Sequence, residues 1–114
     1  MASQVRLNAY RIMWLFVFFD LPTNTKAERK DASKFRKQLL KDGFVMMQYS
    51  VYIRHCPSHE NALMHKKRIK GFLPNKGFVS VLQITDKQYS LIQNFWGLQN
   101  KKPVQKAVPQ LELF

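Results

Sequence analysis

Asp20 follows a long apolar run and is the side chain of this sequence with the clearest capacity for metal chemistry. Eight apolar residues, Ile12–Phe19, come directly before it, and Pro22 follows two residues later. A short apolar run that ends at a proline predicts a buried strand, because proline cannot donate to a sheet hydrogen bond. A carboxylate at the mouth of such a strand can bind a metal ion. The alternative is that Asp20 caps the helix or turn that follows.

No second acidic residue is expected beside Asp20 within one chain. Glu28 is expected in a helix cap, and the other acids fall in expected helices, turns or the C-terminal tail. Magnesium usually takes one or two carboxylates together with waters and phosphate oxygens. In a two-fold dimer, each residue near the axis meets its own copy. We therefore expect two Asp20 side chains to share one Mg²⁺, or another divalent ion, over a phosphodiester; the metal would polarise the phosphate and supply hydroxide.

The segment from His55 to His59 carries three potential metal ligands but does not predict a zinc site. A structural zinc ion needs four ligands, and Cys56 is the one cysteine of the chain. Cys56 is also a poor nucleophile candidate, because neighbouring residues on a strand point to opposite faces and His55 would be turned away from it. His65 falls beside an apolar helix face and is expected in the core rather than in catalysis.

The charge balance predicts affinity for polyanions. The 114 residues hold 19 Lys and Arg against 7 Asp and Glu, which gives a net charge of +12. Such a basic small domain is typical of proteins that bind nucleic acid, with an anionic membrane surface or packing on ribosomal RNA as alternatives. With 46% apolar residues the chain can also build a packed core.

Five lysines gather on one face of a predicted helix. Thr25 and Glu28 form a Thr-x-x-Glu capping box, and Gly43 stands where a left-handed stop is needed, so a helix is expected between them. At about 100° per residue the lysines fall within roughly 80°, opposite the apolar face. We call these residues the lysine ridge: Lys26, Lys30, Lys34, Lys37 and Lys41. Together with the neighbouring Arg29, the ridge is expected to contact nucleic-acid phosphates; the alternative is an ordinary solvated helix surface.

The remaining patterns complete an α+β fold. The expected elements are a strand over 11–20, the basic helix, a strand over 44–54 that bends near 48–50, a helix from Ser58 to about residue 70, a strand over 78–85 and a further edge strand over 89–96. This order predicts a ferredoxin-like βαββαβ sheet with two helices on one face and an extra C-terminal edge strand. An edge strand this aromatic needs cover, most simply from a second copy of the chain, so we expect a homodimer.

Three parts are expected along the chain: a flexible leader (1–10), the ferredoxin-like domain (11–97) and an extended tail (98–114). The tail ends in apolar residues suited to docking on a partner protein, namely Leu111, Leu113 and Phe114. The apolar run before Asp20 is too short to span a bilayer, which takes about 20 residues, and no signal-peptide cleavage site follows it. We therefore expect a cytoplasmic protein that does not bind membranes.

Several motifs resemble a known family. They are Phe18-Phe19-Asp20-Leu21-Pro22-Thr23, Gly43-Phe44 followed by Gln48-Tyr49-Ser50-Val51-Tyr52, and the segment 77–89. In this order and spacing, over about residues 11–96, the chain resembles CRISPR-associated protein two, the small adaptation protein of CRISPR systems. The Asp-Leu-Pro-Thr form and the Leu-Glu-Leu-Phe ending are most similar to members from type II systems.

The resemblance implies a ferredoxin-like homodimer with metal-dependent nuclease activity on RNA or DNA in some members. The family aspartate corresponds to Asp20. The resemblance also implies an architectural role in spacer acquisition. In that role the dimer bridges dimers of the integrase, CRISPR-associated protein one, and holds the spacer duplex DNA through its backbone phosphates.

One alternative reading keeps nucleic-acid binding without catalysis. An RNA-recognition module shares the strand-helix order, and Lys76-Gly77-Phe78-Val79 is similar to its aromatic signature. That signature belongs on the third strand, before the second helix, whereas here it follows the second helix. Exposed stacking aromatics on the open face of the sheet would favour this alternative.

Overall fold

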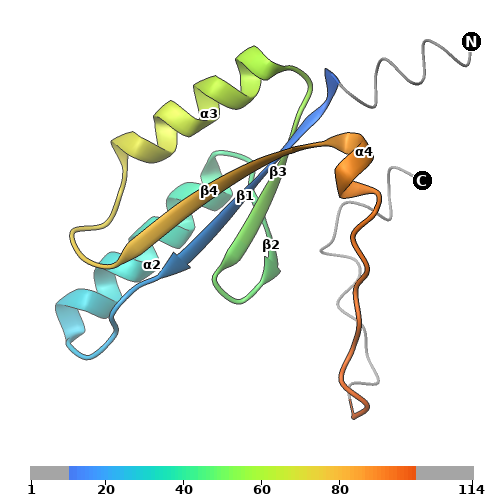
Figure 1. Cartoon of the computed structure of the whole chain (residues 1–114). Coiled ribbons are helices and arrows are strands. Elements are labelled where there is room, and N and C mark those ends of the chain that lie inside the picture. Colours follow the sequence, from blue (N-terminus) through green and yellow to red (C-terminus); the bar gives the residue numbers. More distant parts are fainter. Residues whose placement is uncertain (1–10, 100–114) are drawn as a thin grey trace, which may run out of the picture.

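The structure, a computed structural model, describes residues 11–99 (Figure 1). Its elements in chain order are β1 (Met13–Asp20), α2 (Lys26–Lys41), β2 (Val45–Gln48), β3 (Val51–Cys56), α3 (His59–Gly71), β4 (Phe78–Thr85) and α4 (Asp86–Tyr89). The expected βαββαβ order is confirmed. The expected leader and the end of the tail, with Leu111, Leu113 and Phe114, lie outside the described residues.

The strands form one antiparallel sheet in the order β2-β3-β1-β4. This is the ferredoxin-like order, in which β1 is a central strand. β1 pairs with β3 from Met13↔Cys56 to Phe18↔Val51, and with β4 as far as Asp20↔Phe78. The last residue of β1 is therefore held in the ladder by β4.

The two faces of β1 meet different surroundings. One face contributes four core residues under α2 and α3: Met13, Leu15, Val17 and Phe19. The alternate residues Trp14 and Phe16 belong to a second cluster on the open face, which α2 and α3 do not cover (Figure 1). Because side chains alternate along a strand, Asp20 belongs to this open face.

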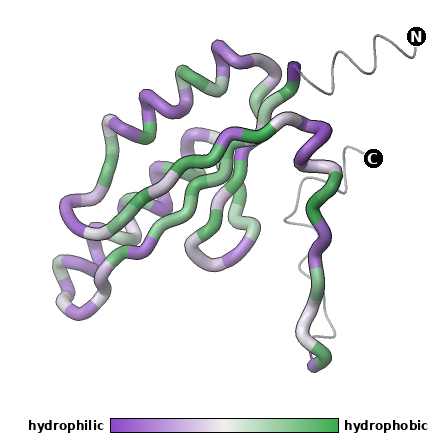
Figure 2. The backbone as a smooth tube through the Cα atoms, in the orientation of Figure 1, coloured by the Kyte–Doolittle hydropathy of each residue, from purple (hydrophilic) through white to green (hydrophobic). Residues whose placement is uncertain are grey.

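The basic helix begins and ends as its sequence predicts. The hydroxyl of Thr25 accepts a hydrogen bond from the backbone N–H of Glu28 at 3.1 Å, and the carboxylate of Glu28 accepts one from the N–H of Thr25 at 3.0 Å. Gly43 has a φ of 90°, the left-handed conformation expected after the helix. Ala32, Phe35 and Leu39 form its buried face. In Figure 2 the strands carry much of the hydrophobic colour, whereas hydrophobic and hydrophilic residues alternate along α2 and α3.

The expected bend in the segment 44–54 is confirmed. Tyr49 and Ser50 form a tight turn between β2 and β3, and Ser50 takes a φ of 73°. β3 is buried on both faces, because α2 and α3 cover Tyr52 while the open-face cluster includes Ile53. α3 begins after the N-cap Ser58, whose hydroxyl accepts from the N–H of Asn61, again as expected.

The expected strand over 89–96 is wrong for this chain. Asp86–Tyr89 is a helical turn, and the following residues up to 97 form turn and irregular structure. Thr85 and Gln88 make a second capping box that starts the turn. The Trp14 indole N–H donates to the Asp86 carboxylate at 2.7 Å, and the Tyr89 ring stacks on Trp14 at 3.8 Å. These contacts hold the segment that begins at Asp86 against the open face, so it does not pair with β4 as an additional strand.

No helix within residues 11–99 combines the length and the apolar character that crossing a bilayer would require.

Candidate functional site

The Asp20 carboxylate is exposed at the end of the central strand. It lies on the open face, where its register partner on β4 is Phe78. Within residues 11–99 it has no hydrogen bond and no ion pair to another side chain, so its oxygens are free to bind a ligand. The same residues contain no group of three or more His, Cys, Asp or Glu side chains that could hold a metal ion. One described chain therefore offers a single carboxylate at this position.

The backbone behind Asp20 is tightly packed against the loop between α3 and β4. Gly77 has a φ of 103°, a conformation that side-chain-bearing residues rarely adopt. A Cβ atom on Gly77 would lie 2.6 Å from the Asp20 carbonyl oxygen and 3.0 Å from the Leu21 Cα atom. This close approach fixes the position of the backbone at the end of β1. No local pattern in the sequence predicts this contact between Gly77 and Asp20.

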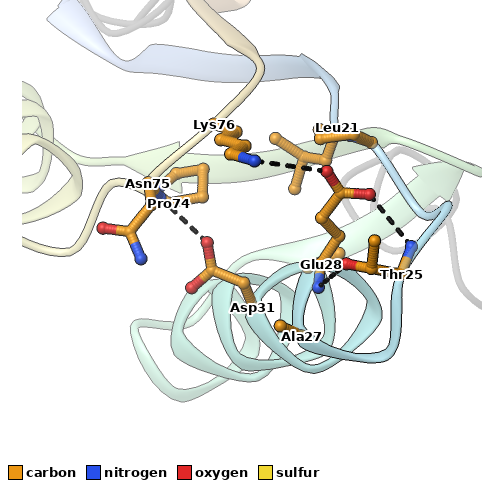
Figure 3. A pocket seen from close by; sticks show the side chains of 10 residues that line it. Leu21, Thr25, Ala27, Glu28, Asp31, Pro74, Asn75 and Lys76 are labelled. Carbon is orange, nitrogen blue, oxygen red and sulfur yellow. Dashed lines mark hydrogen bonds and ion pairs between the residues drawn. The ribbon is translucent and has the colours of Figure 1, made fainter.

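Two polar contacts tie the same loop to α2, around a small cavity of about 130 Å³ (Figure 3). The Asp31 carboxylate accepts a hydrogen bond from the Asn75 backbone N–H at 2.9 Å. The Lys76 ammonium lies 3.6 Å from the Glu28 carboxylate. The hydrogen bond from the Thr25 N–H, more than the charge of Lys76, lowers the pKa of Glu28. We call these two contacts the loop brace. They join the loop before β4, which packs against Asp20, to the first turns of α2, the helix that follows Asp20 in the chain.

The lysine ridge is exposed along its whole length, as expected. Within the described part of the chain none of its five ammonium groups takes part in an ion pair. Lys30, Lys34, Lys37 and Lys41 line one shallow hollow along α2. The Arg29 side chain instead donates to the Thr23 carbonyl at 3.1 Å, so it also secures the turn after β1. The ridge thus offers unneutralised positive charge, which is what phosphate contacts need.

The histidines and the cysteine are separated as the strand alternation predicts. The His55 ring packs edge-on against Trp14 on the open face, with ring centroids 5.2 Å apart. Cys56 lies in the core on the helix side, where burial raises the pKa of its thiol. The His59 ring lies 3.3 Å from the Gln83 amide. These side chains do not converge on one point.

His65 is a buried core residue, as its position predicts. Its Nδ1 atom lies 2.7 Å from the Asp42 carboxylate, and Arg68 donates to the other oxygen of that carboxylate at 2.9 Å. The Arg54 side chain donates to the backbone carbonyl of Asp42 at 2.9 Å. Asp42 therefore joins the end of α2 to α3 and β3. Its role was not predicted, because the three partners are far away in sequence.

Together these features define a strongly basic ferredoxin-like α+β protein with one free carboxylate at the end of its central strand. The chain belongs to the CRISPR associated protein Cas2 family, whose family model matches residues 13–92.

Relatives and a solved structure agree with this assignment. The chain is 58% identical over 111 residues to a protein of Flavobacterium psychrophilum named CRISPR-associated endoribonuclease Cas2, covering 96% of this chain and 94% of the relative. A protein of the same name from Parvibaculum lavamentivorans is 49% identical over 102 residues, covering 90% of this chain and 100% of the relative. A structure titled "Crystal structure of cas2" matches with a TM-score of 0.56 at 19% identity, over 82% of this chain and 94% of that chain, and so supports the fold.

Proposed function

We propose that this protein is a metal-dependent phosphodiesterase whose active site is completed by a second copy of the chain. The observation that carries the proposal is the free, exposed Asp20 carboxylate at the end of β1. The relatives that carry the name endoribonuclease support a nuclease activity, with RNA as the first substrate class to test. A carboxylate oxygen is a suitable ligand for Mg²⁺ or another hard divalent ion.

The open face supplies the argument for a homodimer. Phe18 is 39% exposed, Phe78 is 78% exposed and Leu82 is 47% exposed, and all three side chains belong to the face that carries Asp20. Such neighbouring apolar side chains favour a partner surface. A second copy packed here across a two-fold axis would place its own Asp20 near the first. One divalent ion per dimer would then have two carboxylate ligands.

The chain's own residues would each have a simple role in the reaction. The two Asp20 carboxylates hold the metal, which when bound polarises the phosphodiester and supplies hydroxide. Gly77 and the loop brace fix the position of the backbone that carries each Asp20 carboxylate. The lysine ridge holds phosphates of the same nucleic acid without reading its bases, because phosphate contacts position a strand but do not specify its sequence.

We propose a second, architectural role from the family assignment. The basic dimer would hold a spacer duplex DNA by its phosphates and bridge dimers of CRISPR-associated protein one. Leu111, Leu113 and Phe114 would dock on that integrase. Duplex affinity should then fall steeply with salt and vary little with sequence.

Replacing Asp20 with Asn tests the catalytic proposal. The purified variant should bind single-stranded RNA and duplex DNA like the parent but lose divalent-dependent cleavage. Mixed dimers make the test sharper: if one Asp20 from each protomer is needed, activity should follow the square of the parent fraction. Glu60→Gln is the matched control, because it neutralises an exposed acid on α3. Unchanged cleavage by Asp20→Asn, or a linear dependence on the parent fraction, contradicts the shared site.

The RNA-recognition alternative has one observation in its favour. Phe18 and Phe78 are exposed aromatics on the open face, where such modules stack bases. However, Phe78 lies on β4, after the second helix, and the matched family is a different one. Sedimentation of the free protein separates the two readings, since a dimer buries these rings and a monomer leaves them open to RNA.

A further inference from the structure

An exposed tyrosine stands beside the end of β1 with its ring held by an arginine. Tyr49 is 75% exposed, at the turn between β2 and β3. The Arg36 guanidinium, from α2, lies over the Tyr49 ring at 4.9 Å from its centroid and over the Phe19 ring at 5.5 Å. A planar guanidinium between rings of the core and the surface holds the outer ring in one orientation.

The turn that carries Tyr49 is a close neighbour of Asp20. The backbone N–H of Phe19 donates to the Ser50 carbonyl at 3.1 Å, one step beyond the last ladder pair of β1 with β3, Phe18↔Val51. Adjacent strands lie about 4.8 Å apart. The Tyr49–Ser50 turn and the last residues of β1 therefore form one continuous rim of the sheet.

The Arg36 guanidinium has ring contacts but no anionic partner within the described residues. Its Nε atom is buried without a hydrogen-bond partner, and no acidic side chain of residues 11–99 forms an ion pair with the guanidinium. A guanidinium without an anionic partner attracts one, and its terminal nitrogens donate well to phosphate oxygens. The arrangement thus combines an exposed aromatic ring with an adjacent cation that lacks an anion. Single-stranded nucleic acid offers the two matching groups, a base with a π-face and a phosphate.

We propose that Tyr49 is a stacking site for one nucleobase of a single-stranded nucleic acid, whose backbone crosses the rim of the sheet from the α2 side, where Arg36 holds Tyr49, to the open face that carries Asp20. The base lies on the outer face of the Tyr49 ring. Arg36 supports the inner face and places positive charge beside the neighbouring phosphate. A base in a duplex is already stacked, so this site discriminates in favour of single strands. The inference rests on the proposed nuclease function and adds to it a residue that binds a base.

Single-stranded RNA containing 2-aminopurine tests the proposal, with the full chain in the Asp20→Asn background so that binding is separated from cleavage. The fluorescence of the base should be quenched when the label is walked to the position that reaches Tyr49. Tyr49→Ala should abolish the quench and weaken single-strand binding by about tenfold, the usual range for one stacked base. Tyr49→Trp should keep both. Duplex DNA affinity should be unchanged.

Leu63→Ala is the control, since it removes an exposed apolar side chain from α3 and should leave binding unchanged. An abasic nucleotide at the quenched position gives a test with no change in the protein. It should weaken binding to the parent and not to Tyr49→Ala. Equal binding of RNA by the parent and Tyr49→Ala, or an equal loss for duplex DNA, overturns the proposal. Retained cleavage in Asp20→Asn would instead overturn the catalytic role of Asp20 and leave the quench in place.

Discussion

Gly77 lies against the backbone of Asp20, and no side chain fits between them. A Cβ atom on Gly77 would stand 2.6 Å from the Asp20 carbonyl oxygen, closer than real Cβ contacts allow. The neighbouring atom is backbone, so it cannot move aside as the end of a flexible side chain could. The position of the proposed metal ligand is thus coupled to one glycine of the loop between α3 and β4.

Gly77→Ala should therefore displace the end of β1. Its φ of 103° adds backbone strain to the contact, and strain of this kind costs about 1–3 kcal/mol. We expect a lower free energy of unfolding in urea, at fixed protein concentration, and a larger loss of divalent-dependent cleavage than of RNA binding. Gly71→Ala is the matched control, because nothing lies within 4 Å of its Cβ position. If the two variants behave alike, the contact does not position Asp20.

The sequence predicted those features that depend on neighbours along the chain. The Thr25–Glu28 capping box, the stop at Gly43 and the bend near Ser50 are local, and each is confirmed. The contacts that position Asp20 join residues more than forty positions apart, so local patterns gave no sign of them.

The strand expected over 89–96 failed for a related reason. Its apolar residues suited a strand, but Trp14 on β1 drew Tyr89 and Asp86 onto the open face. The sequence alone does not reveal this competition, because Trp14 and Asp86 are 72 positions apart and become neighbours only in the folded sheet.

The lysine ridge should set the salt dependence of nucleic-acid binding. Replacing Lys30, Lys34 and Lys37 with Gln removes three exposed charges from α2. On duplex DNA, the slope of log K against log salt should become shallower by about 0.9 for each lysine that contacts a phosphate. Fluorescence anisotropy titrations at several salt concentrations measure the slope. The same change at three lysines of α3, Lys66, Lys67 and Lys70, is the control. Equal slopes for both variants would show that the salt dependence reflects the total charge of the protein and not specific phosphate contacts of the lysine ridge.

Asp42 should matter more for stability than its position at a helix end indicates. Asp42→Ala leaves His65 buried without the partner that now lies 2.7 Å away, and an unsatisfied buried group costs about 1–3 kcal/mol. Arg68→Ala removes the other partner, whose side chain is 54% exposed, and should cost under about 1 kcal/mol. Urea unfolding of both variants gives the comparison. A larger loss for Arg68→Ala would contradict the assignment of His65 as the critical partner.

His55 should make the fold less stable as the pH falls below neutral. Burial against Trp14 lowers the pKa of His55 from its usual 6.5; the Asp86 carboxylate opposes this shift and Arg54 adds to it. With a lowered folded-state pKa, the unfolded chain binds the proton first. Stability is therefore greatest above about pH 6.5 and declines as the pH falls toward the folded-state pKa, below which both states are protonated.

Replacing His55 with Phe keeps an aromatic ring against Trp14 and removes the titrating group. The difference between the urea midpoints of the parent and of His55→Phe should therefore be constant above about pH 7 and change as the pH falls below 6.5, down to the folded-state pKa of His55. An NMR titration of the His55 ring in the folded parent gives an independent measure, with a pKa below 6.5 expected. Parallel profiles for the two proteins would mean that the open face around Trp14 admits water and leaves His55 solvated.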